Sequence, residues 1–147
     1  MNNKKLAISY LKDAEIIFEE AKEPFRKKHW HRVVRKAQEA SELAGKALLI
    51  YLGVEYPKKH FIGKIIEKLD LENKIILAYY LDSLASEREK ALYGTKFEAA
   101  SEIFSEDDAK NALEKCEWVI NYIKRFLEKS QKIDSSSISK AVKIFII

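Results

Sequence analysis

The sequence predicts an all-α fold, a bundle of four long helices and one short helix, on three observations. Apolar residues recur at spacings of three and four over most of the chain, which is the period of an amphipathic helix. No segment alternates apolar and polar residues as a half-buried strand does. The 147 residues include four Gly and two Pro, too few turn-forming residues for a fold of many short strands.

Composition also limits the function. The net charge is +4, and residues 131–147 hold three Lys against one Asp, so half of the surplus belongs to that segment. A bias this weak permits an anionic partner without requiring one. A single cysteine, Cys116, excludes an internal disulfide and a multi-cysteine metal site, and we expect neither a metal nor a cofactor. No apolar run approaches the roughly 18 residues of a membrane helix, which predicts a cytoplasmic protein without a membrane partner.

The first two helices are predicted over residues 4–22 and 29–52. Pro24 ends the first helix. The second half of the second helix is apolar nearly all round, so this helix is either the central helix of the domain or part of a dimer seam. Gly53 is its expected C-cap. The apolar positions of the two helices are Leu6, Tyr10, Ala14, Ile17 and Ala21, then Trp30, Val33, Val34, Ala37, Ala44, Leu48 and Tyr51.

A short helix and a longer one follow. The short helix ends near Leu69, and Asp70 is the expected N-cap of a helix over residues 71–93. Residues 94–104, which include Gly94, are expected to form a loop. The buried side of the short helix is Phe61, Ile65, Ile66 and Leu69, and that of the longer one is Leu77, Leu81, Leu84, Ala85 and Leu92.

The last helix has the clearest start. Ser105 is its expected N-cap, and the three acidic residues that follow meet the positive end of the helix dipole. Its apolar stripe runs to about Lys129 and includes Cys116, which we interpret as an inert core thiol. Residues 131–147 differ in character and contain a run of three serines. We therefore divide the chain into a helical domain, residues 1–130, and a C-terminal extension, residues 131–147.

Arg88 is a charged residue at an apolar position. On a helix of about 100° per residue it lies inside the apolar stripe of the helix predicted over residues 71–93. Burial of an unpaired guanidinium is very costly, so a negative partner is expected. Arg88 either forms a buried ion pair with Glu42 or Glu39 that fixes two helices together, or binds an anion in a cleft.

Gln38, Glu42 and Lys46 are four residues apart and stack along one side of the second helix. They form either a solvated ladder with a Glu42–Lys46 pair or the polar lining of a groove or subunit interface, because apolar residues flank them. His60 follows two lysines and opens the short helix. It is either a cap or surface residue, or a proton donor or phosphate ligand beside those lysines.

Residues 26–36 carry six Lys or Arg together with Trp30. This segment is either a nucleic-acid surface, with charge and a ring for stacking, or a solvated helix start with Trp30 in the core. Positive charge at a helix N-terminus is unfavourable, so counter-charge from Glu19, Glu20 and Glu23 or from an external anion is expected. A metal site at the two histidines that flank Trp30 is rejected, since residues two apart on a helix face different sides.

Four short motifs follow the order found in HEPN domains, a family named for nucleotide binding in higher eukaryotes and prokaryotes. Ala37–Ile50 resembles the family's second-helix pattern of Gln, Ala-x-Glu and Lys-Ala-Leu. Pro57–His60 resembles its Pro-x-x-His step, and Ser86–Gly94 resembles its Glu-Arg-x-x-x-x-Tyr-Gly element. Ser105–Ala109 resembles the start of its last helix. The order and spacing of these motifs, over roughly residues 4–129, carry the resemblance.

The resemblance implies an up-and-down bundle that forms a homodimer. It also implies that the protein binds a minimal nucleotidyltransferase, as in prokaryotic toxin–antitoxin pairs. Many members of the family are metal-independent ribonucleases, whose motif is an Arg followed by a His four to six residues later. Arg88 stands at the Arg of this motif, whereas Tyr93 stands five residues on and no His follows. A tyrosine hydroxyl is a poor proton shuttle at neutral pH, which favours binding over cleavage.

Three hypotheses about function result. The first is a non-catalytic module that binds nucleotide or RNA and docks a nucleotidyltransferase. The second is a metal-independent ribonuclease that uses Arg88 with His60 or Tyr93. The third is a purely structural dimerisation scaffold. The residues expected to line a ligand site are Arg88, Tyr93, Lys46, Glu42, Gln38 and His60.

Overall fold

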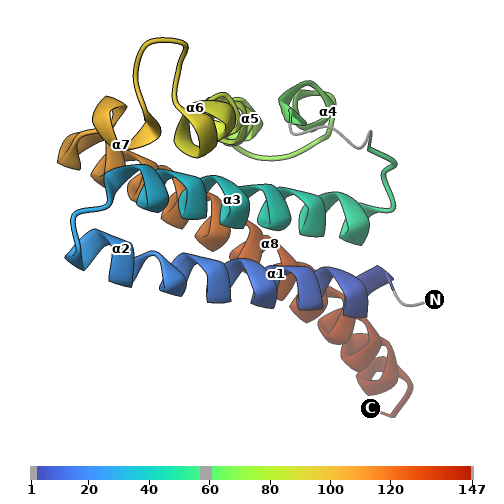
Figure 1. The fold of residues 1–147 in the computed structure, drawn as a ribbon. Coiled ribbons are helices and arrows are strands. Elements are labelled where there is room, and N and C mark those ends of the chain that lie inside the picture. The colour runs from blue at the N-terminus through green and yellow to red at the C-terminus, as the bar shows by residue number, and fades with distance from the viewer. Residues whose placement is uncertain (1–2, 57–60, 147) are drawn as a thin grey trace.

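The structure, a computed structural model, describes residues 3–56 and 61–146, with side chains described as far as Ser130. No strand occurs in these ranges, and the helices pack into one bundle (Figure 1), which confirms the predicted all-α fold. The helices, in chain order, are α1 (Asn3–Glu20), α2 (Lys22–Arg26), α3 (Trp30–Leu52), α4 (Gly63–Glu67), α5 (Lys74–Ala85), α6 (Arg88–Tyr93), α7 (Ala100–Ile103) and α8 (Glu106–Ile146).

Helix α3 is the central element of the bundle. It packs against α1 on one side, against α5 and α6 on another, and against α8 (Figure 1). Ala37, Ala44 and Leu48 on its predicted stripe are fully buried. Gly53 ends the helix in the left-handed region, with φ of 68°, which confirms it as the C-cap. The nearly all-apolar second half of α3 is thus explained by its place at the centre of the domain.

The N-terminal region divides differently from the prediction. Helix α1 stops at Glu20, and α2 carries Pro24 in its first turn instead of ending before it. Proline is tolerated there because N–H groups in the first turn of a helix have no partner within the helix. The prediction that Pro24 ends the first helix is therefore wrong, and the break falls at Ala21.

The helix predicted over residues 71–93 is two helices, α5 and α6. Leu77, Leu81 and Leu84 are buried as expected, but the chain turns at Ser86 and Glu87. The Ser86 hydroxyl donates to the Ser83 carbonyl oxygen at 2.7 Å, a local bond that competes with regular helix formation. Arg88 therefore begins a new helix. The helical wheel that placed Arg88 within the apolar stripe assumed one continuous helix over residues 71–93, so that placement is wrong.

The start of α5 also differs from the prediction. The helix begins at Lys74, and its N-cap position is Asn73, with φ of 54°, so Asp70 is not the cap. Asparagine is one of the few residues that adopts this left-handed conformation readily. Residues 68–73 consequently connect α4 to α5, with a turn at Glu72 and Asn73 immediately before α5.

Helix α4 begins in close contact with α5. The Gly63 N–H donates to Asp82 Oδ1 at 2.9 Å, and a Cβ on Gly63 would lie 2.2 Å from Asp82 Oδ2, so only glycine allows this approach. Ile62 is 1% exposed, whereas Phe61 is 55% exposed. The prediction that Phe61 belongs to the buried side is therefore wrong, because the helix starts two residues later than its spacing assumed.

Helix α8 is longer than predicted. Its start is a reciprocal cap, in which the Asp108 N–H donates to Ser105 Oγ at 3.2 Å and the Ser105 N–H donates to Asp108 Oδ2 at 2.8 Å. The predicted end near Lys129 is wrong, since α8 continues to Ile146. Figure 1 shows its C-terminal part extending beyond the other helices. The division at residue 130 into a domain and an extension stays a prediction.

Candidate functional site

Arg88 is the first residue of α6, directly after the turn that separates α5 from α6. It is half-buried, and it forms no hydrogen bond or ion pair with any residue that the structure describes. One of the two carboxylates considered as its partner, Glu39, pairs instead with Arg35, at 3.3 Å. The observed contacts therefore favour an arginine with capacity for an external anion over one that fixes two helices together.

Gln38 lies on α3, the helix against which α6 packs, and is 1% exposed. Its side-chain oxygen accepts a hydrogen bond from Arg35 Nη1. The other side of the amide, Gln38 Nε2, is buried and has no acceptor among the described residues, and the same is true of Arg35 Nε. A buried donor without an acceptor costs about 1–3 kcal/mol, so two of them one turn apart need an explanation such as a water molecule or a ligand oxygen.

Glu42 and Lys46 continue the polar side of α3 and are both half-buried. The Lys46 ammonium lies 5.7 Å from the centre of the Tyr56 ring, a distance at which a cation is attracted to the ring face. The lysine is thus directed toward the residues that follow α3. Gln38, Glu42 and Lys46 share one side of this helix, as their spacing predicts.

Tyr93 is the last residue of α6 and is 78% exposed. Five residues on a helix correspond to a rotation of about 500°, or about 140° after a full turn, so Tyr93 and Arg88 face different sides of α6. The structure brings them into one short helix but not onto one face. His60, together with Lys58 and Lys59, lies outside the described residues.

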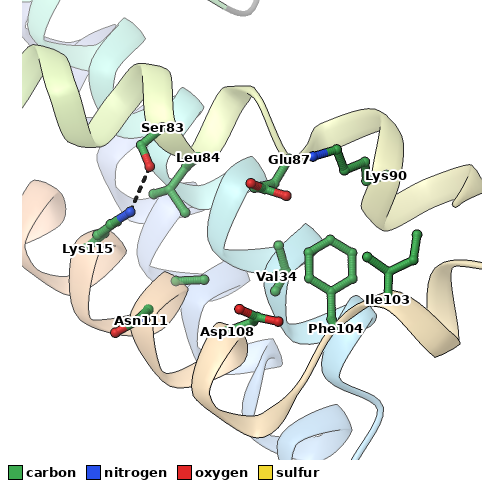
Figure 2. A pocket seen from close by; sticks show the side chains of 11 residues that line it. Val34, Ser83, Leu84, Glu87, Lys90, Ile103, Phe104, Asp108, Asn111 and Lys115 are labelled. Atoms are coloured by element: carbon green, nitrogen blue, oxygen red, sulfur yellow. Dashed lines mark hydrogen bonds between the residues drawn. The ribbon is translucent and has the colours of Figure 1, made fainter. Parts of the chain in front are cut away.

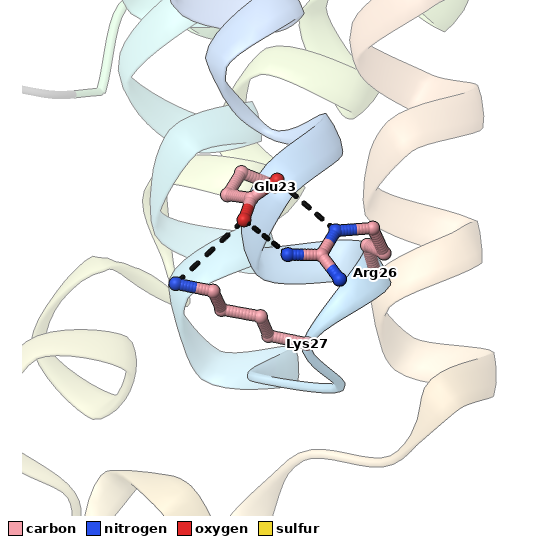
Figure 3. A network of polar contacts seen from close by, with 3 residues as sticks. All are labelled: Glu23, Arg26 and Lys27. Carbon is pink, nitrogen blue, oxygen red and sulfur yellow. Dashed lines mark hydrogen bonds and ion pairs between the residues drawn. The ribbon is translucent and has the colours of Figure 1, made fainter.

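Part of the positive charge of residues 26–36 is paired within the chain. Glu23 accepts from Arg26 Nε at 3.2 Å and pairs with Lys27 at 3.6 Å (Figure 3). The hydrogen bond from Arg26 lowers the pKa of the exposed Glu23 carboxyl, and that bond raises the pKa of Arg26. Lys36 pairs with Glu20 at 3.2 Å. The counter-charge predicted from Glu20 and Glu23 is confirmed.

Trp30 and Cys116 both belong to the packed interior. Trp30 is half-buried and meets the Phe25 ring edge-on at a centroid distance of 5.2 Å. Cys116 is completely buried, and burial raises the pKa of its thiol to about 12. A thiol this reluctant to ionise is a poor nucleophile, which agrees with its interpretation as an inert core residue.

A pocket of about 290 Å³ lies where α5 and α6 meet α7 and α8 (Figure 2). The Lys115 ammonium donates to Ser83 Oγ at 2.7 Å within it. Glu87 and Asp108 balance the charges of Lys90 and Lys115, so the pocket has no clear preference for an anion. Sequence reasoning missed this pocket because its residues come from separate segments with no shared spacing. Its polar lining residues are Ser83, Glu87, Lys90, Asp108, Asn111 and Lys115.

Two further findings concern metals and membranes. Across residues 3–56 and 61–146, no group of three or more His, Cys, Asp or Glu residues is placed to hold a metal ion. In the same ranges no helix combines the length and the apolar character needed to span a membrane.

The fold and these residues define a class of protein, a small α-helical bundle. Its central helix carries buried polar side chains and packs against a short helix whose first residue, Arg88, has no partner in the described part of the chain. The chain matches the model of the HEPN domain over residues 7–126, and it belongs to that family. Membership supports, in general terms, a module that binds nucleotides or RNA. A comparison with curated proteins gives no match.

Proposed function

We propose that this HEPN domain is a non-catalytic module that binds a nucleotide or RNA by its phosphate groups, with Arg88 as the principal ligand. The observation that carries the proposal is that the half-buried Arg88 forms no hydrogen bond or ion pair with a described residue. A guanidinium offers five N–H donors in a planar fork that matches a phosphate at two oxygens. An anion is the simplest partner for such a group.

The polar side of α3 supports the same proposal. Gln38 Nε2 and Arg35 Nε are buried donors without acceptors in the described chain, and α3 packs against the helix that begins with Arg88. A phosphate or a base carbonyl supplies acceptor oxygens and no competing positive charge. Ligand binding would therefore also satisfy donors that have no partner among the described residues.

We further infer that the module does not cleave RNA. Metal-independent cleavage of a phosphodiester needs a group that accepts and returns a proton near the reacting oxygen. Tyr93 occupies the place of the expected histidine in the sequence, but it is 78% exposed and faces a different side of α6 from Arg88. Among the described residues Arg88 therefore has no adjacent proton shuttle, and binding without one fits a regulatory or docking role.

The proposal includes a homodimer and a minimal nucleotidyltransferase as partner, both on the basis of family resemblance. Co-expression of the chain with such an enzyme, followed by purification through a tag on the enzyme, tests the partnership. A stable complex in fixed stoichiometry is expected. Loss of the chain at the first wash would remove the nucleotidyltransferase from the proposal and leave the ligand site untouched.

The ligand site is tested by titrating the full chain with ATP and with a short fluorescent single-stranded RNA. Arg88→Ala should weaken binding by about 10- to 100-fold, since a hydrogen-bonded charge contributes about 1.5–3 kcal/mol. Arg88→Lys should restore part of it, because lysine keeps the charge but loses the fork. Arg125→Ala, an exposed arginine on α8, is the matched control and should change little.

Each alternative has a distinct result in this assay. Cleavage of the RNA in the absence of metal ions, abolished by Arg88→Ala, would support a ribonuclease. Failure to bind either probe would favour a structural dimerisation scaffold and overturn the proposal. Circular dichroism of each variant shows whether the bundle is intact.

A further inference from the structure

The pocket between α5, α6, α7 and α8 combines two acidic and two basic side chains with an apolar wall, and the proposed function does not use it (Figure 2). Its volume of about 290 Å³ lies at the lower limit of the roughly 300–1,000 Å³ typical of small-molecule sites. The charges of the two acidic and two basic residues cancel, and the carboxylates would repel a phosphate group. A ligand for this pocket should therefore be small and carry no net charge.

The charged side chains of this pocket do not pair with one another. The side chains of Glu87 and Lys90 form no hydrogen bond or ion pair with any residue that the structure describes. Asp108 accepts from the Ser105 N–H through Oδ2 only. Asp108 and Lys115 lie seven residues apart on α8, or about 10 Å along its axis, and no ion pair joins them. A molecule that carries both a positive and a negative group can bridge charges arranged in this way.

One end of the pocket offers hydrogen-bond donors, and we call Ser83, Asn111 and Lys115 the donor end (Figure 2). The Lys115 ammonium donates to Ser83 Oγ at 2.7 Å and keeps two further N–H donors. Because Ser83 Oγ is the acceptor in this bond, its own hydrogen is left to be donated, and no described residue accepts it. The side-chain amide of Asn111 has no partner in the described chain either. These donors suit a carboxylate.

The middle of the pocket lies between two carboxylates, Glu87 and Asp108, which we call the carboxylate pair. Figure 2 shows them on opposite sides of the pocket, Glu87 directly before α6 and Asp108 in the first turn of α8. A primary ammonium has three N–H donors and can bond both carboxylates at once. Among the described residues no third His, Cys, Asp or Glu joins them to hold a metal ion. The cation that fits the carboxylate pair is therefore an ammonium group.

The end of the pocket away from Lys115 is apolar (Figure 2). Val34 and Phe104 are 1% and 9% exposed, and Ile103 is half-buried. We call these three residues the apolar wall, and covering it removes further apolar surface from water. The donor end, the carboxylate pair and the apolar wall follow one another along the pocket. A carboxylate, an ammonium and an apolar side chain on one carbon atom, as in an α-amino acid, match these three parts.

We propose that this pocket binds a free α-amino acid with an apolar side chain. The donor end holds the carboxylate of the ligand, the carboxylate pair holds its ammonium, and the apolar wall receives its side chain. Arg88 does not line the pocket, so the inference goes beyond the proposed function and does not rest on it.

Isothermal titration calorimetry of the full chain with L-leucine tests the proposal. A dissociation constant between about 10 µM and 1 mM is expected for a ligand of this size. N-acetyl-leucine, which lacks the ammonium, and leucinamide, which lacks the carboxylate, should each bind at least about tenfold more weakly. Equal binding of the three compounds would overturn the proposal, because it would show that the pocket reads the apolar side chain alone.

Two substitutions assign each charge of the ligand to its part of the pocket. Glu87→Gln should weaken leucine binding about tenfold and remove the preference for leucine over N-acetyl-leucine. Lys115→Gln should instead remove the preference for leucine over leucinamide. Glu89→Gln is the matched control, since Glu89 is exposed on α6 and lies outside the pocket, and it should leave all three affinities unchanged. Circular dichroism of each variant shows whether the bundle is intact.

The outcomes separate this proposal from the ligand site at Arg88. Absence of binding by leucine, valine and phenylalanine at millimolar concentration would overturn the amino-acid site and leave the RNA site as proposed. So would variants of Glu87 and Lys115 that fold correctly and bind leucine as the wild type does. Conversely, leucine binding in a chain that binds neither ATP nor RNA would support the amino-acid site and overturn the proposed function alone.

Discussion

Arg26 and Arg88 both lie in short helices with a glutamate nearby, but the chain treats their charges differently. Arg26 is exposed and is held by Glu23 one turn earlier, a pair set entirely by local sequence. Arg88 is half-buried, and no described residue provides it with a counter-charge. The charge of Arg26 is balanced by a neighbour in sequence. The charge of Arg88, which lies where helices meet, has no counter-charge among the described residues and is therefore the one available to a ligand.

The sharpest test of this comparison substitutes the two arginines in turn. Arg88→Ala should reduce the affinity for RNA about 10- to 100-fold, because it removes the guanidinium that is expected to hold the phosphate at two oxygens. Arg26→Ala should change the affinity by less than about twofold, since Glu23 already screens that charge. Fluorescence anisotropy at one fixed salt concentration measures both. Equal losses would place binding on the basic segment and contradict the site on α6.

A second test loosens the contact between α4 and α5 without touching the region of α2. Gly63→Ala brings a Cβ against the Asp82 carboxylate, which must rotate away and lose its 2.9 Å bond to the Gly63 N–H. We expect a loss of about 1–2 kcal/mol in the free energy of unfolding. Relative to the wild type, amide hydrogen exchange in the variant should accelerate more in α4 and α5 than in α2.

A third test changes a side chain of the candidate site and leaves the backbone as it is. The substitution is Gln38→Glu. The new carboxylate can still accept from Arg35, but it replaces the buried N–H₂ donor with negative charge. The affinity for RNA should fall about tenfold with a small change in stability. Unchanged affinity would show that the Gln38 donor serves a buried water and not a ligand.

The smallest expected effect concerns the loss of folding stability at low pH. The folded pKa of Glu23 is lowered from its ordinary value of 4.5 by Arg26. A lowered pKa stabilises the folded state above the ordinary value, and this contribution is lost as the pH falls through the folded pKa. Glu23 is exposed, so the effect is slight. Thermal midpoints should fall slightly more between about pH 5 and pH 3 in the wild type than in Glu23→Gln.

Helices were predicted correctly from the sequence wherever an apolar stripe and a capping residue belonged to the same helix. Helix α3 with Gly53, and the start of α8 at Ser105, are of this kind. The prediction failed where local bonds competed with periodicity, as at Ser86, where the serine hydroxyl bonds back to Ser83 and divides one expected helix into two. The last helix was expected to end near Lys129, but it continues through the run of three serines to Ile146.

The candidate site was predicted in part. The anomaly of Arg88 was visible as a charge among apolar positions, and Gln38 was visible through its spacing with Glu42 and Lys46. The absence of a described partner for Arg88 and the open donors of Gln38 and Arg35 depend on how α3 and α6 pack, which no local pattern encodes. The pocket around Lys115 joins residues from helices far apart in sequence and was missed for the same reason.

The buried thiol of Cys116 makes this chain convenient to label. Burial raises the pKa of this thiol to about 12, so it is very largely un-ionised near pH 8, and burial also keeps reagents away from it. A cysteine introduced at the surface should therefore react with a maleimide dye or a nitroxide while the native one stays unmodified. Distances between two copies of the protein, or changes when RNA is added, become measurable by spectroscopy without first replacing a core residue.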